Sequence, residues 1–509
     1  MERHKQAVGK IAAAVKGFYA RSEPYRINHG STNSTRPRRG AAHARAVDIS
    51  SLSNVLSVDA ASRTALVEPN VPMDKLVAST LRHGLVPPVV MEFPGITAGG
   101  GYAGTAGESS SFRHGFFNDN VRSVEMVLGN GDVVTASREE RRDLFEGAAG
   151  AVGTLGVTTL LELELMEAKR FVRTTYHRVN SVDEAVARVR EATLDPDNDY
   201  VDGILFSRDH GAIITGRLTD DKPRDAKPQT FSGAWDPWFY LHVQERTSAP
   251  SSSSSSSSSD YVPLAEYLFR YDRGGFWVGA SAFAYFKFVP FTRFFRWFLD
   301  DFLHTRMLYR ALHGSGESAR FVVQDLALPY ASARDFVDYA ADHFAIWPLW
   351  LCPLKQTPAP TFHPHHERSR SGSGAEPEQL LNVGLWGWGP ANPDAFVAKN
   401  RALEDKLAQL GGMKWLYAHT YYSREEFWQQ YDGAWYEGLR AKYHAGTLPS
   451  VYDKVKVDVR HREAELRSWR QRVKAVQPLG GLYGIWKSIQ SGDYWLHRRA
   501  EWKYKPKDE

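Results

Sequence analysis

The residues of this chain best suited to chemistry lie in one stretch, FPGITAGGGYAGTAGESSSFRHGFFNDN at 93–120. Between Thr97 and Ser109 five residues are Gly, and Tyr102 is the only large apolar side chain. Gly has no Cβ, so its N–H can approach a diphosphate closely, and nearby hydroxyls add donors. We interpret the stretch as a cradle for the two phosphates of a dinucleotide. A flexible surface loop is the alternative, but the apolar residues before it and the strand-like VRSVEMVL after it favour the cradle.

The stretch does not match the common nucleotide motifs well. A P-loop, GxxxxGK[ST], does not occur in the sequence. The GxGxxG spelling at Gly99, Gly101 and Gly104 is followed by ESSSFRHG, a poor helix former, whereas a Rossmann loop opens a helix. The sequence therefore predicts a dinucleotide held by loops in another fold.

Composition sets the outer limits. A chain of 509 residues predicts two or more domains, and a net charge of +4 gives no support for nucleic-acid binding. The single cysteine, Cys352, excludes disulfides within the chain and a cysteine-based metal site. No signal peptide opens the sequence.

One aromatic stretch raises the question of a membrane. A spanning helix needs about 20 apolar residues, and Phe276–Phe291 is interrupted by Lys287 and Pro290. We expect a buried aromatic helix or strand pair there. The alternative is a contact with a membrane surface, because the aromatics alternate with basic residues.

The predicted elements mix helices and strands. Hairpins are expected around Asp59–Arg63 and at the Asn130–Gly131 turn. In the second half, strands are expected at 201–206, 212–218 and 414–422. Helices are expected at 72–83, at 393–410, after the capping box at 181–184, and continuously from the capping box at 423–426 to about 443.

These elements divide the chain into parts. We expect an N-terminal helix at 1–24, a first α+β unit at 25–168, a second mixed α+β unit at 169–458 and a basic C-terminal tail at 459–509. The tail is expected to be a solvated helical end, with membrane contact as the alternative. The second unit contains a Ser-rich linker at 247–260 and a loose loop at 356–379. That loop holds His363, His365 and His366, and because it has no carboxylate or Cys at ligand spacing we predict no metal site.

Several motifs occur in one order: GSTNS at 30–34, PGITAGG followed by GTAGESSSFRHG, SVEMVLGNGDV, and DLFEGAAGAVGTLGVTT. Together they resemble the FAD-binding domain of the vanillyl-alcohol oxidase/p-cresol methylhydroxylase (PCMH-type) family. FVVQDLALP, WPLWLCP, YAHTYYSREEFWQQYDG and LPSVYDK are similar to the delta(24)-sterol reductase group. The resemblance covers about 25–458. It implies an α+β fold, with a PCMH-type FAD-binding domain of two α/β subdomains followed by a mixed α+β substrate (cap) domain.

The resemblance also implies which residues hold FAD. They form a first phosphate loop, a pyrophosphate loop and a segment beside the adenine and ribityl groups: Gly30, Ser31, Thr32, Asn33 and Ser34; Thr97, Ala98, Gly99, Gly100, Gly101, Tyr102, Ala103, Gly104, Thr105, Ala106, Gly107, Glu108, Ser109 and Ser110; Gly153, Thr154, Gly156 and Val157. Some relatives attach flavin through a His in the first loop. Asn33 stands at the comparable position here, which implies non-covalent FAD.

The implied reaction is reduction of the delta-24 side-chain double bond of a sterol with NADPH, peripherally at the endoplasmic reticulum membrane or else in the cytoplasm. An unpolarised alkene needs a proton donor and an apolar cavity. The candidate donors are Tyr421, Glu426, Glu108 and His114, and Trp350, Trp386, Trp388 and Trp428 are candidate cavity walls. Two alternatives stay open: an FAD-linked oxidase of an alcohol or other small substrate using O₂, and a lipid-binding protein without activity. The sequence does not indicate an oligomeric state.

Overall fold

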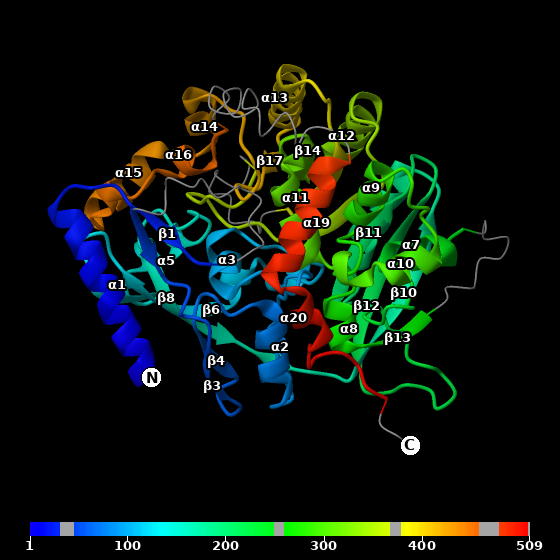
Figure 1. Cartoon of the computed structure of the whole chain (residues 1–509), viewed down its shortest axis with the longest axis horizontal. Coiled ribbons are helices and arrows are strands. Elements are labelled where there is room, and N and C mark those ends of the chain that lie inside the picture. Colours follow the sequence, from blue (N-terminus) through cyan, green and yellow to red (C-terminus); the bar gives the residue numbers. More distant parts are fainter. Residues whose placement is uncertain (31–44, 249–258, 367–377, 458–477, 507–509) are drawn as a thin grey trace.

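The chain is built around two large β-sheets that lie side by side (Figure 1). The computed structural model describes residues 1–30, 45–248, 259–366, 378–457 and 478–506. A five-stranded sheet organises the N-terminal part, and an eight-stranded antiparallel sheet organises the part that follows. The prediction of a mixed α+β fold in two successive units is confirmed.

The first helix, α1 (Glu2–Ala20), covers the N-terminal part at its outer edge. Its buried residues His4, Val8, Ile11 and Val15 are spaced by four, three and four positions, which places them on one helical face. The buried His4 lies 2.9 Å from Glu68 and 3.1 Å from Glu125, so the helix is held by polar contacts as well as by packing.

The five-stranded sheet has the order β3-β4-β8-β6-β7. On β8 the residues alternate between buried and partly exposed, as expected for a strand with one face on the core. Both predicted hairpins are confirmed, and Gly131 adopts the positive φ of +93° that the second turn requires. The strand bounds are β3 Val55–Asp59, β4 Thr64–Val67, β6 Val121–Val127, β7 Val133–Ser137 and β8 Val157–Glu164.

Smaller elements surround this sheet, and two of the helices among them, α3 and α4, lie within the glycine-rich stretch. The bounds are β1 Arg26–Asn28, β2 Ala46–Asp48, α2 Met73–Leu81, β5 Leu85–Val86, α3 Ala98–Ala103, α4 Ser111–His114, η2 Phe117–Asn120, α5 Arg142–Ala148 and β9 Met166–Glu167.

The glycine-rich stretch is not a loop throughout, which corrects the prediction. Residues 98–103 form the helix α3, and the side chain of its N-cap Thr97 accepts a hydrogen bond from the Gly100 N–H. Close packing explains two of its glycines. A Cβ on Gly99 would lie 2.7 Å from Pro69, and one on Gly101 would lie 2.5 Å from Met91.

The eight-stranded sheet has the order β13-β10-β12-β11-β15-β16-β14-β17. Its central strands β15 and β16 are buried almost throughout, because helices and loops cover both faces. The bounds are β10 Phe171–Val179, β11 Tyr200–Leu205, β12 Gly211–Thr219, β13 Ser259–Pro263, β14 Phe321–Pro329, β15 Leu349–Leu354, β16 Leu380–Trp388 and β17 Met413–Lys414.

The remaining helices pack on this sheet or follow it. Their bounds are α6 Val182–Leu194, α7 Phe239–Arg246, α8 Leu264–Leu268, α9 Val278–Tyr285, α10 Arg293–Phe298, η3 Asp300–Phe302, α11 Thr305–Ser315, η4 Glu317–Ala319, α12 Tyr330–His343, α13 Pro393–Gln409, α14 Arg424–Gln430, α15 Gly433–Lys442, η6 Ala445–Thr447, α16 Val451–Val455, α19 Leu479–Ser491 and α20 Tyr494–Arg498.

Four sequence-based expectations need correction here. The strand expected at 414–422 ends at Lys414, and the helix expected from the capping box to about 443 is broken at Tyr431 and Asp432. The Ser-rich segment enters β13 at Ser259, while 249–258 lie outside the described residues. The loose loop is packed over its described part, and His363, 1% exposed, lies 2.6 Å from Asn118. Among the described residues no group of His, Cys, Asp and Glu could hold a metal ion.

The aromatic stretch at 276–291 is only partly buried. Phe283 on α9 is buried as predicted, but Phe288 and Phe291 after it are exposed. No helix in the described part of the chain combines the length and the apolar character needed to cross a bilayer.

A buried ion pair fixes the segment that leaves β17. Lys414 and Glu404 are 0% and 2% exposed, with Nζ 2.8 Å from Oε1. Lys414 also donates to the His419 carbonyl, and Glu404 accepts from the Tyr421 N–H at 2.9 Å. The pair therefore shapes the turn between these residues, which contains Trp415 and Tyr417.

We predict that Lys414→Met lowers the stability of the C-terminal part by about 3–5 kcal/mol, because it leaves the Glu404 carboxylate buried without its cation. Thermal unfolding followed by circular dichroism measures the change. Arg334→Met, which breaks the exposed pairs with Asp183 and Asp338, is the control and costs less than about 1 kcal/mol. Equal effects of the two substitutions would contradict the role given to the buried pair.

Candidate active site

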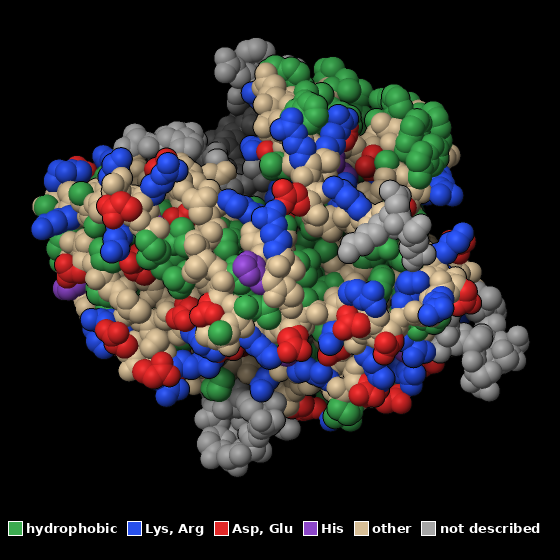
Figure 2. Space-filling view, turned by 90° about the horizontal axis from the view of Figure 1, so that it is seen from below, with side chains coloured by type: hydrophobic (Ala, Val, Ile, Leu, Met, Phe, Trp, Pro, Cys, Tyr) green, Lys and Arg blue, Asp and Glu red, His purple; other side chains and the backbone are tan. Residues whose placement is uncertain are grey.

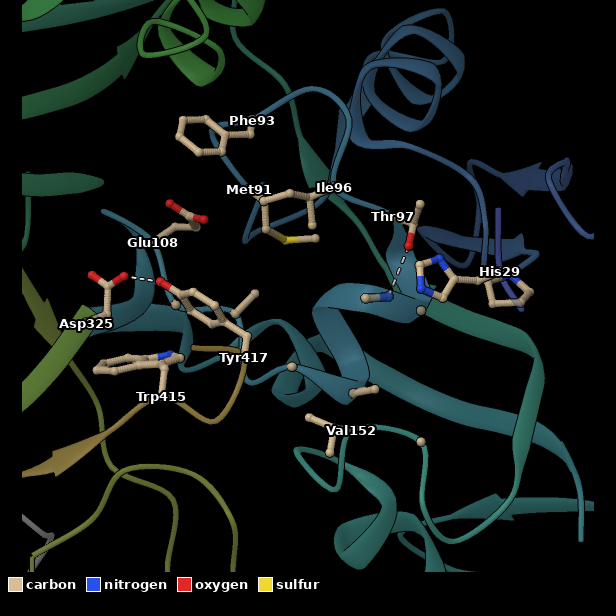
Figure 3. Close-up of a pocket in the computed structure, with 18 of the residues that line it drawn as sticks. His29, Met91, Phe93, Ile96, Thr97, Glu108, Val152, Asp325, Trp415 and Tyr417 are labelled. Carbon is tan, nitrogen blue, oxygen red and sulfur yellow. Dashed lines mark hydrogen bonds between the residues drawn. The ribbon is translucent and has the colours of Figure 1, made fainter. Parts of the chain in front are cut away.

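A large cavity suited to a ligand lies between the two sheet units (Figure 3). It contains about 1770 Å³ of empty space, its open mouth included. Its walls come from α3 and the residues after it, from the loop that precedes β8, from β14 and β16, and from the segment after β17. The two ends differ in chemistry.

One end is lined mainly by backbone. Thr97, Gly100 and Gly104 contribute one wall and the Val152–Gly156 loop contributes the opposite one. Gly153 has a φ of +70°, a conformation that favours glycine. Two basic residues, His29 and Lys454, also line the cavity, and Lys454 donates to the Val152 carbonyl. Exposed main chain and basic groups are suited to phosphate.

The other end is aromatic and contains carboxyl groups. Phe276, Trp350 and Trp386 form a tilted cluster with ring centroids 4.5 to 6.0 Å apart. Phe93 packs edge-on against Phe276 at 5.6 Å and Tyr309 completes this wall. Such a lining favours an apolar substrate.

A buried charge cluster stands behind the aromatic wall. Arg270, 1% exposed, lies 2.8 Å from Glu92 and 3.0 Å from Asp202. One guanidinium is thus shared by two carboxyl groups. Burial raises the pKa of Glu92 and the Asp202 charge raises it further, although Arg270 partly offsets both effects.

Asp325 enters the cavity from the middle of β14. It accepts hydrogen bonds from Asn382 at 2.9 Å, from the Trp386 indole at 3.3 Å and from the Tyr417 hydroxyl (Figure 3). Gly384, its partner on β16, leaves room for it, since a Cβ there would lie 3.1 Å from the carboxylate. Burial outweighs the three donors and raises the pKa of Asp325 to about 6.

Glu108 faces the same end from the N-terminal unit (Figure 3). Burial raises the pKa of its carboxyl group well above the usual range, and the nearby charges of Glu92 and Asp325 raise it further, whereas Arg270 lowers it. These effects favour the neutral form of the Glu108 side chain, which can give up a proton.

The segment after β17 closes the cavity. The Trp415 indole donates to the Thr105 carbonyl at 2.7 Å, which links the two sheet units directly. Thr105 has a φ of +55°, unusual for a β-branched residue. Two residues later Tyr417 reaches Asp325.

The cavity contains part of the predicted cofactor set. The predicted residues that line it are Thr97, Gly99, Gly100, Ala103, Gly104, Ala106, Gly107, Glu108, Gly153 and Gly156. Those outside its lining are Gly30, Ala98, Gly101, Tyr102, Thr105, Ser109, Ser110, Thr154 and Val157. Ser31, Thr32, Asn33 and Ser34 lie outside the described residues.

Of the four predicted proton donors, only Glu108 lines the cavity. Glu426 closes a capping box with Ser423 and pairs with Arg401 at the surface. Tyr421 packs in a second hydrophobic cluster, and His114 ends α4 beside Arg113. None of these three is in the cavity lining.

Sequence reasoning missed Glu92, Asp325, Tyr417, His29 and Lys454. A signal existed for Asp325, a lone acid in the apolar strand FVVQDLALP. Trp350 and Trp386 do line the cavity, whereas Trp388 lines a second one and Trp428 stacks on Tyr436.

Comparisons with known proteins agree with this geometry. Residues 6–137 match the family model described as FAD binding domain. The chain carries a PCMH-type FAD-binding domain. It is 29% identical to human delta(24)-sterol reductase over 420 residues, 81% of this chain and 77% of that protein. It is 28% identical to the delta(24)-sterol reductase of Arabidopsis thaliana over 455 residues, 84% and 79% of the two chains.

A shorter match covers less than a third of the chain. Cytokinin dehydrogenase 4 of Oryza sativa subsp. japonica is 34% identical over 149 residues, 29% of this chain and 28% of that protein. The chain is thus an FAD-dependent oxidoreductase, similar over most of its length to delta(24)-sterol reductases.

The residues present fit FAD. The backbone-lined end with His29 and Lys454 suits a diphosphate, and the continuous cavity leads from there to Glu108 and Tyr417. A Cβ on Gly104 would lie 2.7 Å from the Gly100 carbonyl oxygen. The close packing of the chain at this wall therefore requires glycine at position 104.

We predict that Gly104→Val lowers FAD affinity at least about tenfold, because the added side chain displaces the α3 end of the wall. The ratio of flavin to protein absorbance after desalting measures bound cofactor. Gly438→Val is the matched control, since a Cβ at Gly438 meets no atom within 4 Å. A folded Gly104→Val protein with a full complement of FAD would contradict this account of the wall.

Proposed function

We propose that the protein reduces the delta-24 double bond of a sterol side chain, with NADPH as the reductant and non-covalent FAD as the carrier. The observation that carries this proposal is the position of the Glu108 carboxyl group, whose pKa is raised, in an aromatic cavity beside a flavin domain. The delta(24)-sterol reductases similar to this chain support the choice of substrate. As a site of action we propose the endoplasmic reticulum membrane surface.

The aromatic end binds the substrate. Phe93, Phe276, Trp350 and Trp386 present rings to the cavity, and burial of an aliphatic chain against them excludes water. Tyr309 adds a hydroxyl to this wall. The wall therefore positions an apolar side chain next to the carboxyl groups.

Glu108 supplies the proton. An isolated alkene has no carbonyl to stabilise a carbanion, so protonation of one carbon must accompany hydride addition to the other. When bound and reduced by NADPH, the flavin would supply the hydride. The Glu108 carboxyl, whose neutral form is favoured by burial, gives its proton to one alkene carbon and is left as a carboxylate, whose charge Arg270 partly compensates.

Asp325 and Tyr417 orient the side chains that surround Glu108. The Asp325 carboxylate accepts from Tyr417, Asn382 and Trp386, so it orients three side chains of the wall. Its negative charge also raises the pKa of Glu108. We assign Asp325 and Tyr417 as positioning residues.

We predict that Glu108→Gln slows alkene reduction by about 10²–10⁴-fold, the usual contribution of a general acid, while reduction of the flavin by NADPH stays within about twofold. Stopped-flow measurement of the two half-reactions separates these effects. Glu426→Gln, at the surface, is the control and leaves both rates unchanged. Equal loss of both half-reactions in Glu108→Gln would remove Glu108 from the acid role.

The direction of the Glu108 pKa shift predicts how the rate of alkene reduction changes with pH. The pKa of Glu108 is raised, so its carboxyl group keeps its proton to a higher pH than an ordinary Glu and loses it as the pH rises through that pKa. The rate of the alkene half-reaction in the native protein should therefore fall as the pH rises through that pKa. This decrease should be absent in Glu108→Gln. A rate that rises through the same range would contradict the proposal.

The reductant is tested by visible spectroscopy. Anaerobic NADPH should bleach the flavin absorption of the purified protein, and a sterol with a delta-24 double bond should restore it, whereas the saturated sterol should not. Indifference to NADPH together with fast reoxidation by O₂ on an alcohol substrate would replace this proposal with the oxidase.

A further inference from the structure

Exposed hydrophobic side chains are concentrated in two short stretches. Of the fifteen most exposed large hydrophobic residues among the described ones, ten lie at 288–298 and 479–496. Phe288 is 68% exposed and Phe298 is 66% exposed, and α10 has no buried residue at all. The ten are Phe288, Phe291, Phe294, Phe298, Leu479, Leu482, Trp486, Ile489, Trp495 and Leu496. We call this set the apolar face.

The two stretches adjoin. Gly481 on α19 donates its N–H to the Tyr285 hydroxyl at the end of α9, and a Cβ on it would lie 2.4 Å from Phe286. Figure 1 shows α19 and α10 at the front of the molecule. Figure 2 shows the molecule from below, so the front of Figure 1 lies at its top. Hydrophobic side chains gather at the top right of this view, on the side of the molecule where these helices lie.

Helix α19 buries its small residues and exposes its bulky apolar ones, the opposite of a normal surface helix. Its buried residues are small, namely Gly480, Gly481, Gly484 and Ser488. These allow close contact with α11, where a Cβ on Gly484 would lie 2.4 Å from the Ala311 carbonyl. Its exposed residues Leu479, Leu482, Trp486 and Ile489 follow helical spacing and are bulky and apolar. A globular surface helix buries the bulky residues instead, whereas small residues between helices with bulky ones outside are typical of helices in lipid.

Basic residues border the apolar face. Lys287 and Arg293 are exposed beside the first stretch, and Lys487 and Arg499 are exposed beside the second. Lys487 lies 4.7 Å from the centre of the Trp486 ring and Arg499 lies 4.9 Å from that of Trp495. Tryptophan beside Lys and Arg is the usual composition of a membrane interface.

A second cavity lies beside the apolar face. It holds about 970 Å³ of empty space between α9, α11 and α19, and most of its lining side chains are apolar, with Glu317 as the one charged residue. Partly exposed Phe286, Leu299 and Ile485 are among its walls, and each is close in sequence to a residue of the apolar face. Such a lining suits a lipid-soluble molecule.

The two cavities are neighbours along one strand. Trp386 lines the active-site cavity and Trp388 lines the second one. Residues two apart on a strand point to the same face and are about 7 Å apart. Trp277 lies beside this boundary, with its indole donating to the Trp386 carbonyl at 3.2 Å. Leu308 and Tyr309 on α11 likewise line one cavity each.

We propose that the apolar face docks on a lipid bilayer containing anionic lipids, and that the second cavity takes up a lipid from that bilayer on its way to the active site. The docking does not depend on the proposed reaction, since it requires neither flavin nor NADPH. The route from the second cavity to the active site rests on the proposed function.

Vesicle flotation tests the docking with the purified full-length protein. The protein should float with phosphatidylcholine vesicles that contain phosphatidylserine, and high salt should weaken the binding. Leu482→Glu/Trp486→Glu and Phe294→Glu/Phe298→Glu should each lower the partition coefficient at least about tenfold. All four residues are exposed, so these variants should keep the Tm of the native protein.

Val133→Glu/Leu194→Glu is the matched control. It also replaces two exposed apolar residues by Glu, but both lie outside the apolar face. Equal binding by this control and the two docking variants would overturn the proposal. So would a protein that dimerises through the apolar face, seen as monomerisation by Leu482→Glu/Trp486→Glu, without binding vesicles.

Photolabelling tests the second cavity independently of catalysis. Vesicles carrying a photoreactive sterol should label peptides from 278–289 and 308–315, and the docking variants should lose this label. Labelling that is absent from both peptides while vesicle binding persists would overturn the uptake route. Failure of NADPH to bleach the flavin would instead count against the proposed function and leave the docking result intact.

Discussion

The active-site cavity depends on contacts between the two sheet units, and the hydrogen bond from the Trp415 indole to the Thr105 carbonyl joins them at the glycine-rich wall. Thr105 comes directly after the glycine-rich wall, and Trp415 comes directly after the buried Lys414. The contact therefore joins the cofactor wall of one unit to the substrate wall of the other. Because Lys414 is held by a buried carboxylate, this bridge cannot move without exposing or separating an ion pair in the protein interior.

The chemistry of the cavity follows from an excess of buried carboxyl groups. Glu92, Glu108, Asp202 and Asp325 lie in or beside one end, and Arg270 is the cation that the pKa shifts of Glu92 and Glu108 have in common. Several carboxylates in a dry site cannot all be ionised, because each charge raises the cost of the next. The electrostatic free energy is lowest when at least one of them is neutral. A neutral carboxyl group is the acid that an unpolarised alkene requires.

Two kinds of apolar surface serve different purposes in this molecule. The aromatic wall of the active site is enclosed and is supported by hydrogen bonds from Trp350 and Trp386 to buried carboxylates. The apolar face on α10 and α19 is open to the outside and bordered by Lys and Arg. The second cavity lies between them, so apolar lining continues from the surface toward the flavin domain.

Local pattern in the sequence was enough to predict the mixed α+β architecture, both hairpins and the helices α1, α2, α6 and α13, while the resemblance of its motifs indicated the family of the flavin domain. Turn chemistry at Asn130–Gly131 and helical spacing in α1 act over a few residues, so they can be read without knowing what packs against them. The Gly run was also recognisable, although its helix was not, because Thr97 capping and the close approach of Pro69 and Met91 depend on distant parts of the chain.

Only the tertiary structure decided which polar groups meet. Tyr417 and Tyr421 are four residues apart in one segment, yet Tyr417 reaches Asp325 while Tyr421 packs in another cluster, because the Lys414–Glu404 pair bends the chain between them. Glu108 and Asp325 come from different units and are brought to one cavity by the contact between those units. Burial then sets their protonation, and burial is a property of the assembled fold that no single stretch of sequence contains.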